Sequence, residues 1–412
     1  MSASLVVLVL SMLLGLQPVA TDLYLPSLPT IRLELGAGMP QMQLTLTALL
    51  LAFGVSQLVW GPLSDHYGRK PILLIGLLAF VVASVGSVFA TNIEQLIVWR
   101  TLQGVAMGAG VMCARAIVRD LYAPVDGARI MSKGLTGLGV IAAFSAPVGG
   151  LLAQHMGWRA ALAALAVFSA AALAVVALRF EETAPHKGRT VGAATLLANA
   201  RLILAHRTFW AYAVLSTVSY AGLFTFLAAS SFVFIQVLGH SKTEFALFMT
   251  SMTLAYISGT FICRRLLLRF GVQTTVAIAG ACTLSAGTTM GLLALAGVQS
   301  AWAIMAPFWL FMVGHGVHQP CGQSGAVGPF PQAAGTASAL SGCLMMLAAF
   351  GMGLWLGHSL AGIAPGQGTV LPLTNGIWFW SVLIAATAWT LVRWHGTAPS
   401  PSAAINAARP SA

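Results

Sequence analysis

The chain has 412 residues, of which 58% are hydrophobic and only 7% are charged, and its mean hydropathy is +0.87. These values exclude a water-soluble domain of this size and indicate an integral membrane protein. A net charge of +11 would suggest a nucleic-acid partner in a soluble protein. The distribution of lysine and arginine described below accounts for the same excess, so we expect no nucleic acid.

Apolar runs long enough to cross a bilayer, which takes about 20 residues, recur along the whole chain. The hydrocarbon layer offers no water to the backbone, and each run must therefore form a helix. We predict an all-α integral membrane protein with twelve transmembrane helices. They span Leu5–Leu28, Leu44–Leu63, Pro71–Ala90, Leu96–Ile117, Gly134–Met156, Ala160–Leu178, Thr208–Leu238, Phe245–Cys263, Thr274–Val298, Ala301–Gln319, Gly335–His358 and Leu373–Val392.

The predicted helices fall into two halves of six. The longest polar stretch, Arg179–Arg207, separates the sixth helix from the seventh. We therefore expect a first half at 1–180, a cytoplasmic linker at 181–206, a second half at 207–395 and a flexible cytoplasmic tail at 396–412. The loop after the second helix has a weak counterpart after the eighth. Repeated halves are typical of transporters whose binding site lies between the repeats.

Lysine and arginine predict the orientation of the helices. If both termini are cytoplasmic, sixteen of the 20 basic residues fall on the cytoplasmic side, as membrane proteins prefer. The N-terminal apolar run lacks the basic residues that open a signal peptide, so we interpret it as the first helix. The basic excess therefore reflects topology, and we expect a multi-pass protein with both termini in the cytoplasm.

One carboxylate lies where a charge is costly. Asp22 follows an uncharged stretch that begins at the N-terminus and reads as a membrane span. A charge inside a span costs about 2.5–3.5 kcal/mol on insertion scales, so it usually faces a cavity or a partner. We hypothesise that Asp22 is the proton site of a transporter. The alternative is a purely structural role, in which Asp22 orients two helices.

Arg100 is the candidate partner of Asp22. Counting residues from the ends of their helices puts the two side chains at a similar depth, so they can meet if both helices line one cavity. Burial favours the protonated form of a carboxyl group, whereas a neighbouring arginine favours the charged form. Competition between Arg100, a proton and cargo for Asp22 would couple two fluxes.

Other polar and aromatic residues are candidates for lining the same cavity, because ligand sites are mostly apolar with a few placed polar groups. Arg115 either lines the cavity or extends to the membrane interface. His315 and His318 either contact cargo, titrate, or form helix-packing hydrogen bonds, and we expect no metal because an acid and further ligands are lacking. The full candidate set is Tyr24, Phe53, Gln103, Arg115, Tyr220, Phe224, Phe226, Trp309, His315, His318 and Gln319.

The loop Gly61–Pro71 reads Gly-Pro-Leu-Ser-Asp-His-Tyr-Gly-Arg-Lys-Pro. It resembles the signature between helices 2 and 3 of the major facilitator superfamily. The resemblance implies a cytoplasmic latch in which Asp65 and Arg69 meet Asp120, at the end of the fourth helix, in one conformation and separate in the other. The alternative is a basic turn that serves topology alone.

Two further segments are similar to signatures of that superfamily. Arg100–Gly104 resembles the helix 4 signature, and Ala146–Gly150 resembles the helix 5 pattern of antiporters, with Ala146 in place of the usual glycine. Small residues let helices approach closely, which would seal one side of a cavity or serve ordinary packing. The predicted packing positions are Gly104, Gly108, Pro147, Gly149 and Gly150.

A narrower resemblance extends over both halves. The runs Asp22–Pro29, Arg119–Tyr122, Tyr220–Leu227 and Phe330–Leu340 are similar to the Bcr/CflA drug-resistance transporters. This resemblance implies the major facilitator fold, a monomer in the bacterial inner membrane, and export of small hydrophobic drugs such as chloramphenicol or bicyclomycin. The export would be driven by protons without a cofactor. A metabolite transporter of the same fold is the alternative, and a membrane enzyme or receptor is a distant one.

Overall fold

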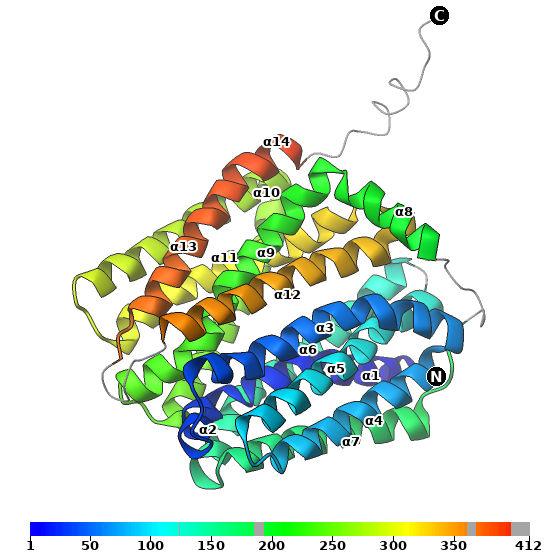
Figure 1. Ribbon diagram of the computed structural model, residues 1–412. Helices are drawn as coiled ribbons and strands as arrows, with labels where there is room; N and C mark the ends of the chain where they lie inside the picture. Colours follow the sequence, from blue (N-terminus) through cyan, green and yellow to red (C-terminus); the bar gives the residue numbers. More distant parts are fainter. Residues whose placement is uncertain (123, 185–192, 361–367, 397–412) are drawn as a thin grey trace, which may run out of the picture.

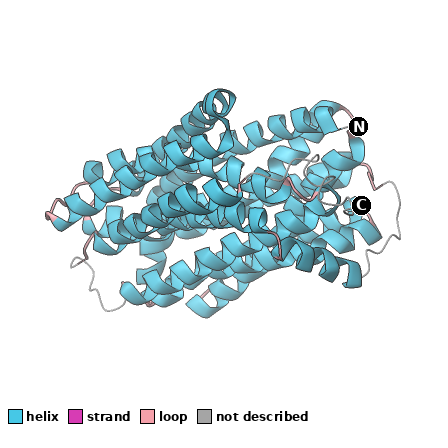
Figure 2. Ribbon diagram, turned by 90° about the horizontal axis from the view of Figure 1, so that it is seen from above, coloured by secondary structure: helices cyan, strands magenta, loops and turns pink. Residues whose placement is uncertain are grey.

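The computed structural model describes residues 1–122, 124–184, 193–360 and 368–396. Within these ranges every regular element is a helix, and the helices form two bundles that lie side by side (Figure 1). Seen from above, the same elements remain long helices joined by short loops (Figure 2). The all-α prediction is confirmed for the described residues.

The first transmembrane segment, Ala3–Glu34, is interrupted about two-thirds of the way along. Helix α1 (Ala3–Asp22) ends there, one 3₁₀ turn, η1 (Leu25–Ser27), follows, and the chain resumes as α2 (Leu28–Glu34). Pro26 and Pro29 lack a backbone N–H, which prevents a continuous helix through this stretch. The other helices of the first half are α3 (Met39–Tyr67), α4 (Arg69–Val88), α5 (Ile93–Leu121), α6 (Pro124–His155) and α7 (Trp158–Arg179).

A short helix, α8 (Ala193–Leu204), precedes the second half. The helices of that half are α9 (Arg207–Ser231), α10 (Lys242–Leu295), α11 (Ala301–Val327), α12 (Ala334–Ser359), α13 (Leu371–Thr387) and α14 (Arg393–His395). Short turns extend three of them, namely η2 (Phe232–Val237) after α9, η3 (Pro331–Ala333) before α12 and η4 (Ala388–Val392) between α13 and α14.

Twelve of these segments cross a membrane, as predicted. Among the described residues, ten helices are long and apolar enough to span a bilayer by themselves. Helix α10 counts twice, because its 54 residues would measure about 81 Å and its backbone reverses at Gly271, where φ is 71°. Helix α11 has 27 residues but contains two prolines and several polar side chains, which lower its hydropathy. It supplies the twelfth span.

The two ends of the bundle differ. Figure 1 places the N-terminus, α8 and α14 toward the same end, which we call the linker end, and the opposite end is called the far end. An even number of spans returns the described chain to the side on which it began. Each span carries the chain to the opposite end. Helix α2 ends the first span and α10 begins after the seventh, so both places lie at the far end.

The two halves meet closely at the far end, over contacts that we call the far-end interface. Gln43 Nε2 of α3 donates to the Ala228 carbonyl of α9 at 2.9 Å. Lys242 Nζ of α10 donates to the Ala153 carbonyl of α6, also at 2.9 Å. A β carbon on Gly150 of α6 would lie 2.8 Å from the Lys242 carbonyl. Only glycine permits this approach without a shift of α10.

We predict that Gly104→Ala destabilises the protein and that Gly139→Ala does not. A β carbon at Gly104 of α5 would overlap the Leu49 backbone of α3, whereas no atom lies within 4 Å of one at Gly139 of α6. Overpacking costs roughly 1–3 kcal/mol, and alanine favours a helix over glycine by up to about 1 kcal/mol. Thermal unfolding in detergent should show a lower midpoint for Gly104→Ala and an equal or higher one for Gly139→Ala. Equal losses for both would contradict the packing described here.

Candidate functional site

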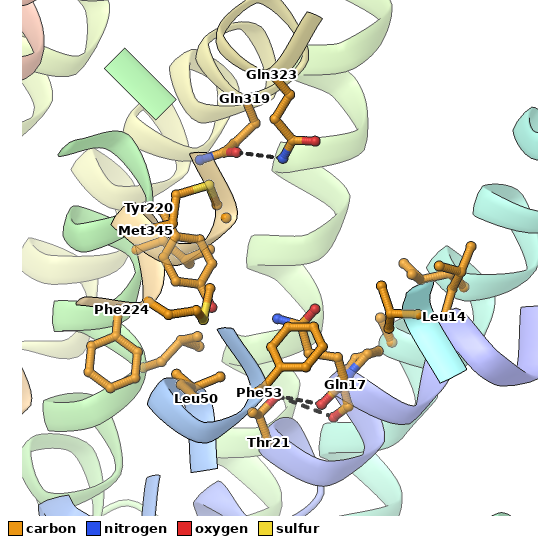
Figure 3. Close-up of a pocket in the computed structure, with 18 of the residues that line it drawn as sticks. Leu14, Gln17, Thr21, Leu50, Phe53, Tyr220, Phe224, Gln319, Gln323 and Met345 are labelled. Atoms are coloured by element: carbon orange, nitrogen blue, oxygen red, sulfur yellow. Dashed lines mark hydrogen bonds between the residues drawn. The ribbon is translucent and has the colours of Figure 1, made fainter. Parts of the chain in front are cut away.

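A cavity of 390 Å³ lies between the two halves. Helices α1, α3, α5 and α6 line it from the first half, and α9 to α12 from the second. Apolar residues, chiefly leucine, methionine and phenylalanine, form most of the wall, as Figure 3 shows for Leu50, Phe53, Phe224 and Met345. The polar lining residues are Gln17, Thr21, Asp22, Gln57, Arg115, Tyr220, Thr253, Tyr256, His315, Gln319, Gln323, Ser338 and Ser341.

Asp22 lies in this cavity as the last residue of α1, directly before the break in the first segment. Its Oδ1 accepts a hydrogen bond from Thr21 Oγ1 at 2.8 Å. Tyr220 of the second half lines the same cavity, beside Gln17 and close to Asp22. Among the residues that the structure describes, no lysine or arginine forms an ion pair with Asp22. The half-buried carboxylate therefore faces the cavity without a cation at its side.

The expected pairing of Arg100 with Asp22 is not present. Arg100 is completely buried, and its Nη2 donates to the Ala20 carbonyl at 2.8 Å. That carbonyl is available because the N–H of Tyr24, its ordinary helical partner, donates to Thr21 instead. Arg100 thus stabilises the broken end of α1, two residues before Asp22, and does not line the cavity.

Two other candidates for the cavity wall surround Arg100 instead. Gln103 Oε1 accepts from Arg100 Nη1 at 2.8 Å, and its Nε2 donates to Ser84 Oγ at 3.0 Å. The Tyr24 ring lies beneath the guanidinium, 4.4 Å from its centroid, and the Tyr24 hydroxyl donates to Thr45 Oγ1 at 2.9 Å. Buried polar groups need such partners, which explains why these side chains turn away from the cavity.

Three more candidates also lie outside the cavity lining. The Phe226 ring stacks on Phe308 with centroids 3.8 Å apart, and Trp309 Nε1 donates to Ser251 Oγ at 2.9 Å. His318 is fully buried on a different side of α11. The helix lines the cavity at four-residue intervals through His315 and Gln319, and residue 318 falls off that stripe.

Six of the predicted residues do line the cavity, namely Phe53, Arg115, Tyr220, Phe224, His315 and Gln319. His315 Nδ1 lies 2.9 Å from Ser219 Oγ, and Gln319 Nε2 donates to the Ser216 carbonyl at 2.9 Å. The sequence analysis missed several polar members. Gln17 and Thr21, and likewise Gln319 and Gln323, are four residues apart, and this spacing of polar residues in apolar helices was an available signal.

A second group of charges lies at the linker end of the first half. Arg69 Nη1 is 2.6 Å from Asp65 Oδ1, and Arg69 Nε is 2.8 Å from Asp120 Oδ2. Arg69 and Asp120 are buried, and Ser64 Oγ accepts a further bond from Arg69 at 2.8 Å. The three residues of the expected latch therefore meet, and they join α3, α4 and α5 of one half.

Glu182, which the sequence analysis did not single out, completes this group. Its carboxylate accepts from the backbone N–H of Arg69 at 2.8 Å and of Lys70 at 3.3 Å, at the start of α4. Burial opposes the charged form, but these bonds and those from Thr183 and Ala184 outweigh it and lower the pKa of Glu182 below its ordinary value. Glu182 caps α4 and ties the beginning of the linker to it.

The glycines of α6 connect the cavity with the far-end interface. A β carbon on Gly149 would overlap the backbone of Leu23, the residue after Asp22, and one on Gly150 would meet α10 of the other half. A β carbon on Gly108 of α5 would likewise overlap the Ser56 hydroxyl of α3. Pro147, the remaining predicted packing position, lies within α6. Neighbouring positions of α6 thus contact the broken first segment on one side and the second half on the other.

We predict that Glu182→Ala lowers the thermal midpoint more than Glu181→Ala, because loss of a helix cap costs roughly 1 kcal/mol. The Glu181 side chain is 76% exposed and serves as the matched control. The folded-state pKa of Glu182 is lowered, so its contribution is present at neutral pH and is lost as the pH falls through about 4.3 towards the lower folded value. The gap between wild type and Glu182→Ala should therefore narrow in acid. A gap that widens in acid would argue against the cap.

Comparison with known proteins agrees with this geometry. A family model described as Major Facilitator Superfamily matches residues 10–354. Multidrug resistance protein D of Escherichia coli K12 is 31% identical over 338 residues, which cover 82% of this chain and 84% of that protein. A chloramphenicol resistance protein of Pseudomonas aeruginosa is 29% identical over 340 residues, covering 82% and 80%.

A solved structure extends the agreement to the fold. The chain superposes on a D-xylose–proton symporter with a TM-score of 0.70, at 13% identity, over 95% of this chain and 99% of that one. At this identity the match concerns the fold alone, and it spans both halves. The chain is a multi-pass membrane protein that belongs to the major facilitator superfamily.

Proposed function

We propose that this protein exports small hydrophobic drugs across the bacterial inner membrane in exchange for protons. The observation that carries the proposal is the Asp22 carboxylate, which lies in a largely apolar cavity between the two halves and has no cation partner among the described residues. The relatives named for multidrug and chloramphenicol resistance support drugs as the cargo class. The excess of basic residues at the linker end supports a cytoplasmic position for that end and for both termini.

Asp22 would couple the two fluxes through the free-energy cost of a charge. An ionised carboxylate is stable while water or a polar cargo group reaches it, but excluding water from an apolar cavity makes the same charge costly. Protonation removes that cost. The halves can then change conformation around a neutral Asp22 more readily than around an ionised one, so a proton and cargo alternate in the cavity.

Arg100 would act on this step from a distance. It binds the Ala20 carbonyl at the end of α1 and lies over Tyr24, on either side of Asp22 in the sequence. Fixing the break in this way holds Asp22 at the cavity and leaves its carboxylate free of a permanent ion pair. Arg100 is therefore a positioning residue in our proposal, and the earlier idea of direct competition for Asp22 is replaced.

The halves would rock to expose the cavity on alternate sides. In the conformation seen here the far-end interface is closed, and the cavity extends toward the linker end as far as Arg115. We infer that this is the state that admits cargo from the cytoplasm. The Asp65–Arg69–Asp120 network is intact in this state, and its role would be to keep the ends of α3, α4 and α5 together as one unit.

We predict that Asp22→Asn abolishes proton-driven drug export, because an amide side chain, unlike a carboxylate, neither takes up nor releases a proton near neutral pH. In proteoliposomes with an imposed proton gradient, uphill chloramphenicol transport should fall at least about ten-fold and drug-induced proton release should disappear. Asp22→Glu should retain part of both activities. Glu94→Gln, which alters an exposed acid at the far end of α5, is the control and should behave like wild type. Full uphill transport by Asp22→Asn would overturn the assignment.

A resistance screen separates the drug proposal from metabolite transport. A hypersensitive strain that expresses the wild type should tolerate hydrophobic antibiotics better than one that expresses Asp22→Asn. Identical susceptibility of the two strains to every antibiotic in the panel would instead favour a metabolite as cargo.

A further inference from the structure

A polar group lies at the linker end of the cavity, opposite Asp22. Arg115 of α5 belongs to the first half, and Ser338 and Ser341 of α12 belong to the second; we call these three residues the Arg115 patch. Arg115 Nη1 donates to Ser338 Oγ at 3.0 Å, across the boundary between the halves. The patch therefore lies where cargo from the linker end would first meet both halves.

Arg115 lines the cavity and is exposed, whereas Arg69 and Arg100 are buried. Among the described residues Arg115 has no anionic partner. Arg69 pairs with two carboxylates, and Arg100 is bound to two carbonyls, Gln103 and an aromatic face. Arg115 has one hydrogen bond among the described residues, although a guanidinium offers five N–H donors. Arg115 and Asp22 are the only charged residues that line the described cavity. The remaining donors of Arg115 are available to an anion.

Ser341 independently indicates a ligand at the same place. It lines the cavity three residues after Ser338, one turn deeper along α12, and is only 3% exposed. Its Oγ has no hydrogen-bond partner in the part of the chain that the structure describes. A buried hydroxyl without a partner costs free energy, and native proteins rarely leave one unless something else binds it.

The separation of the two charged residues defines the shape of a ligand. Arg100 reaches the carbonyl of Ala20, and Arg115 lies fifteen residues further along α5, about 22 Å at 1.5 Å per residue. Asp22 and Arg115 thus mark opposite ends of the cavity. Phe53, Phe224 and other apolar side chains form the wall of the same cavity (Figure 3). A matching ligand has a hydrophobic body and one anionic end.

We propose that the Arg115 patch recognises the carboxylate or phenolate oxygens of an amphipathic organic anion. Guanidinium pairs well with planar oxygen anions, and the two hydroxyls can donate to the same group. Arg115 attracts an anion and repels a cationic drug at this end of the cavity, and the opposite end leaves Asp22 free to exchange its proton. This inference rests on the proposed drug transport and names the class of cargo within it.

Equilibrium binding to the purified full-length protein in lipid nanodiscs tests the proposal. The probes are fusidate, an amphipathic carboxylate, and its uncharged methyl ester, which has the same hydrophobic body. Wild type should bind fusidate at least about ten-fold more tightly than the ester, and Arg115→Gln should lose this preference while it binds the ester normally. Arg115→Lys should retain part of the preference because the positive charge remains.

Ser338→Ala separates recognition of an anion from a purely structural contact between the halves. This variant removes the 3.0 Å bond to Arg115 and one hydroxyl of the patch but keeps the charge, so the preference for fusidate should fall by less than it does in Arg115→Gln. Equal binding of the two probes by wild type, an unchanged preference in Arg115→Gln, or no saturable binding of either probe would overturn the proposal. Because binding is measured without a gradient, failure of proton-driven export would be recognised separately, in the proteoliposome assay.

Discussion

An interrupted helix inside a membrane exposes backbone carbonyls that must find partners, since lipid offers none. In this protein the interruption follows Asp22, and the Ala20 carbonyl finds its partner in the buried guanidinium of Arg100. This single interaction fixes the end of α1 against α5 and occupies the nearest arginine. Asp22 consequently faces the cavity, and Thr21 is its one hydrogen-bond donor among the residues that the structure describes. A carboxylate in that position can exchange a proton, which a carboxylate paired permanently with arginine would do far less readily.

The packing around the interruption connects it to the rest of the molecule. Gly149 brings α6 against Leu23, and Gly150 brings the same helix against α10 of the other half. Helix α6 therefore contacts both the segment at Asp22 and the far-end interface. At the other end, Glu182 and the network around Arg69 join α3, α4 and α5. The linker end of the first half is thus held together by tight internal contacts, as rocking of a half as one unit requires.

Much of the fold could be predicted because hydropathy and helix length follow directly from the bilayer. The site was less accessible, since residue counting gives depth in the membrane but not the direction of a side chain. Depth alone put Arg100 beside Asp22, yet the break after α1 supplied a carbonyl as a nearer partner. His318 and His315 are three residues apart, but only His315 falls on the cavity stripe of α11. Glu182 was missed because its partners are backbone amides far away in the sequence.

The central claim is that the protonation of Asp22 controls which side of the molecule is open. Spin labels on the exposed positions Leu33 and Leu247 would report the distance between the halves at the far end, and labels on Tyr67 and Leu268 the distance at the linker end. Pulsed electron resonance would measure both distances at about pH 5.5 and at about pH 8.5, which changes the proton supply to Asp22. We predict opposite, pH-dependent shifts of the two distances in wild type and none in Asp22→Asn. Shifts that persist unchanged in Asp22→Asn would contradict the account.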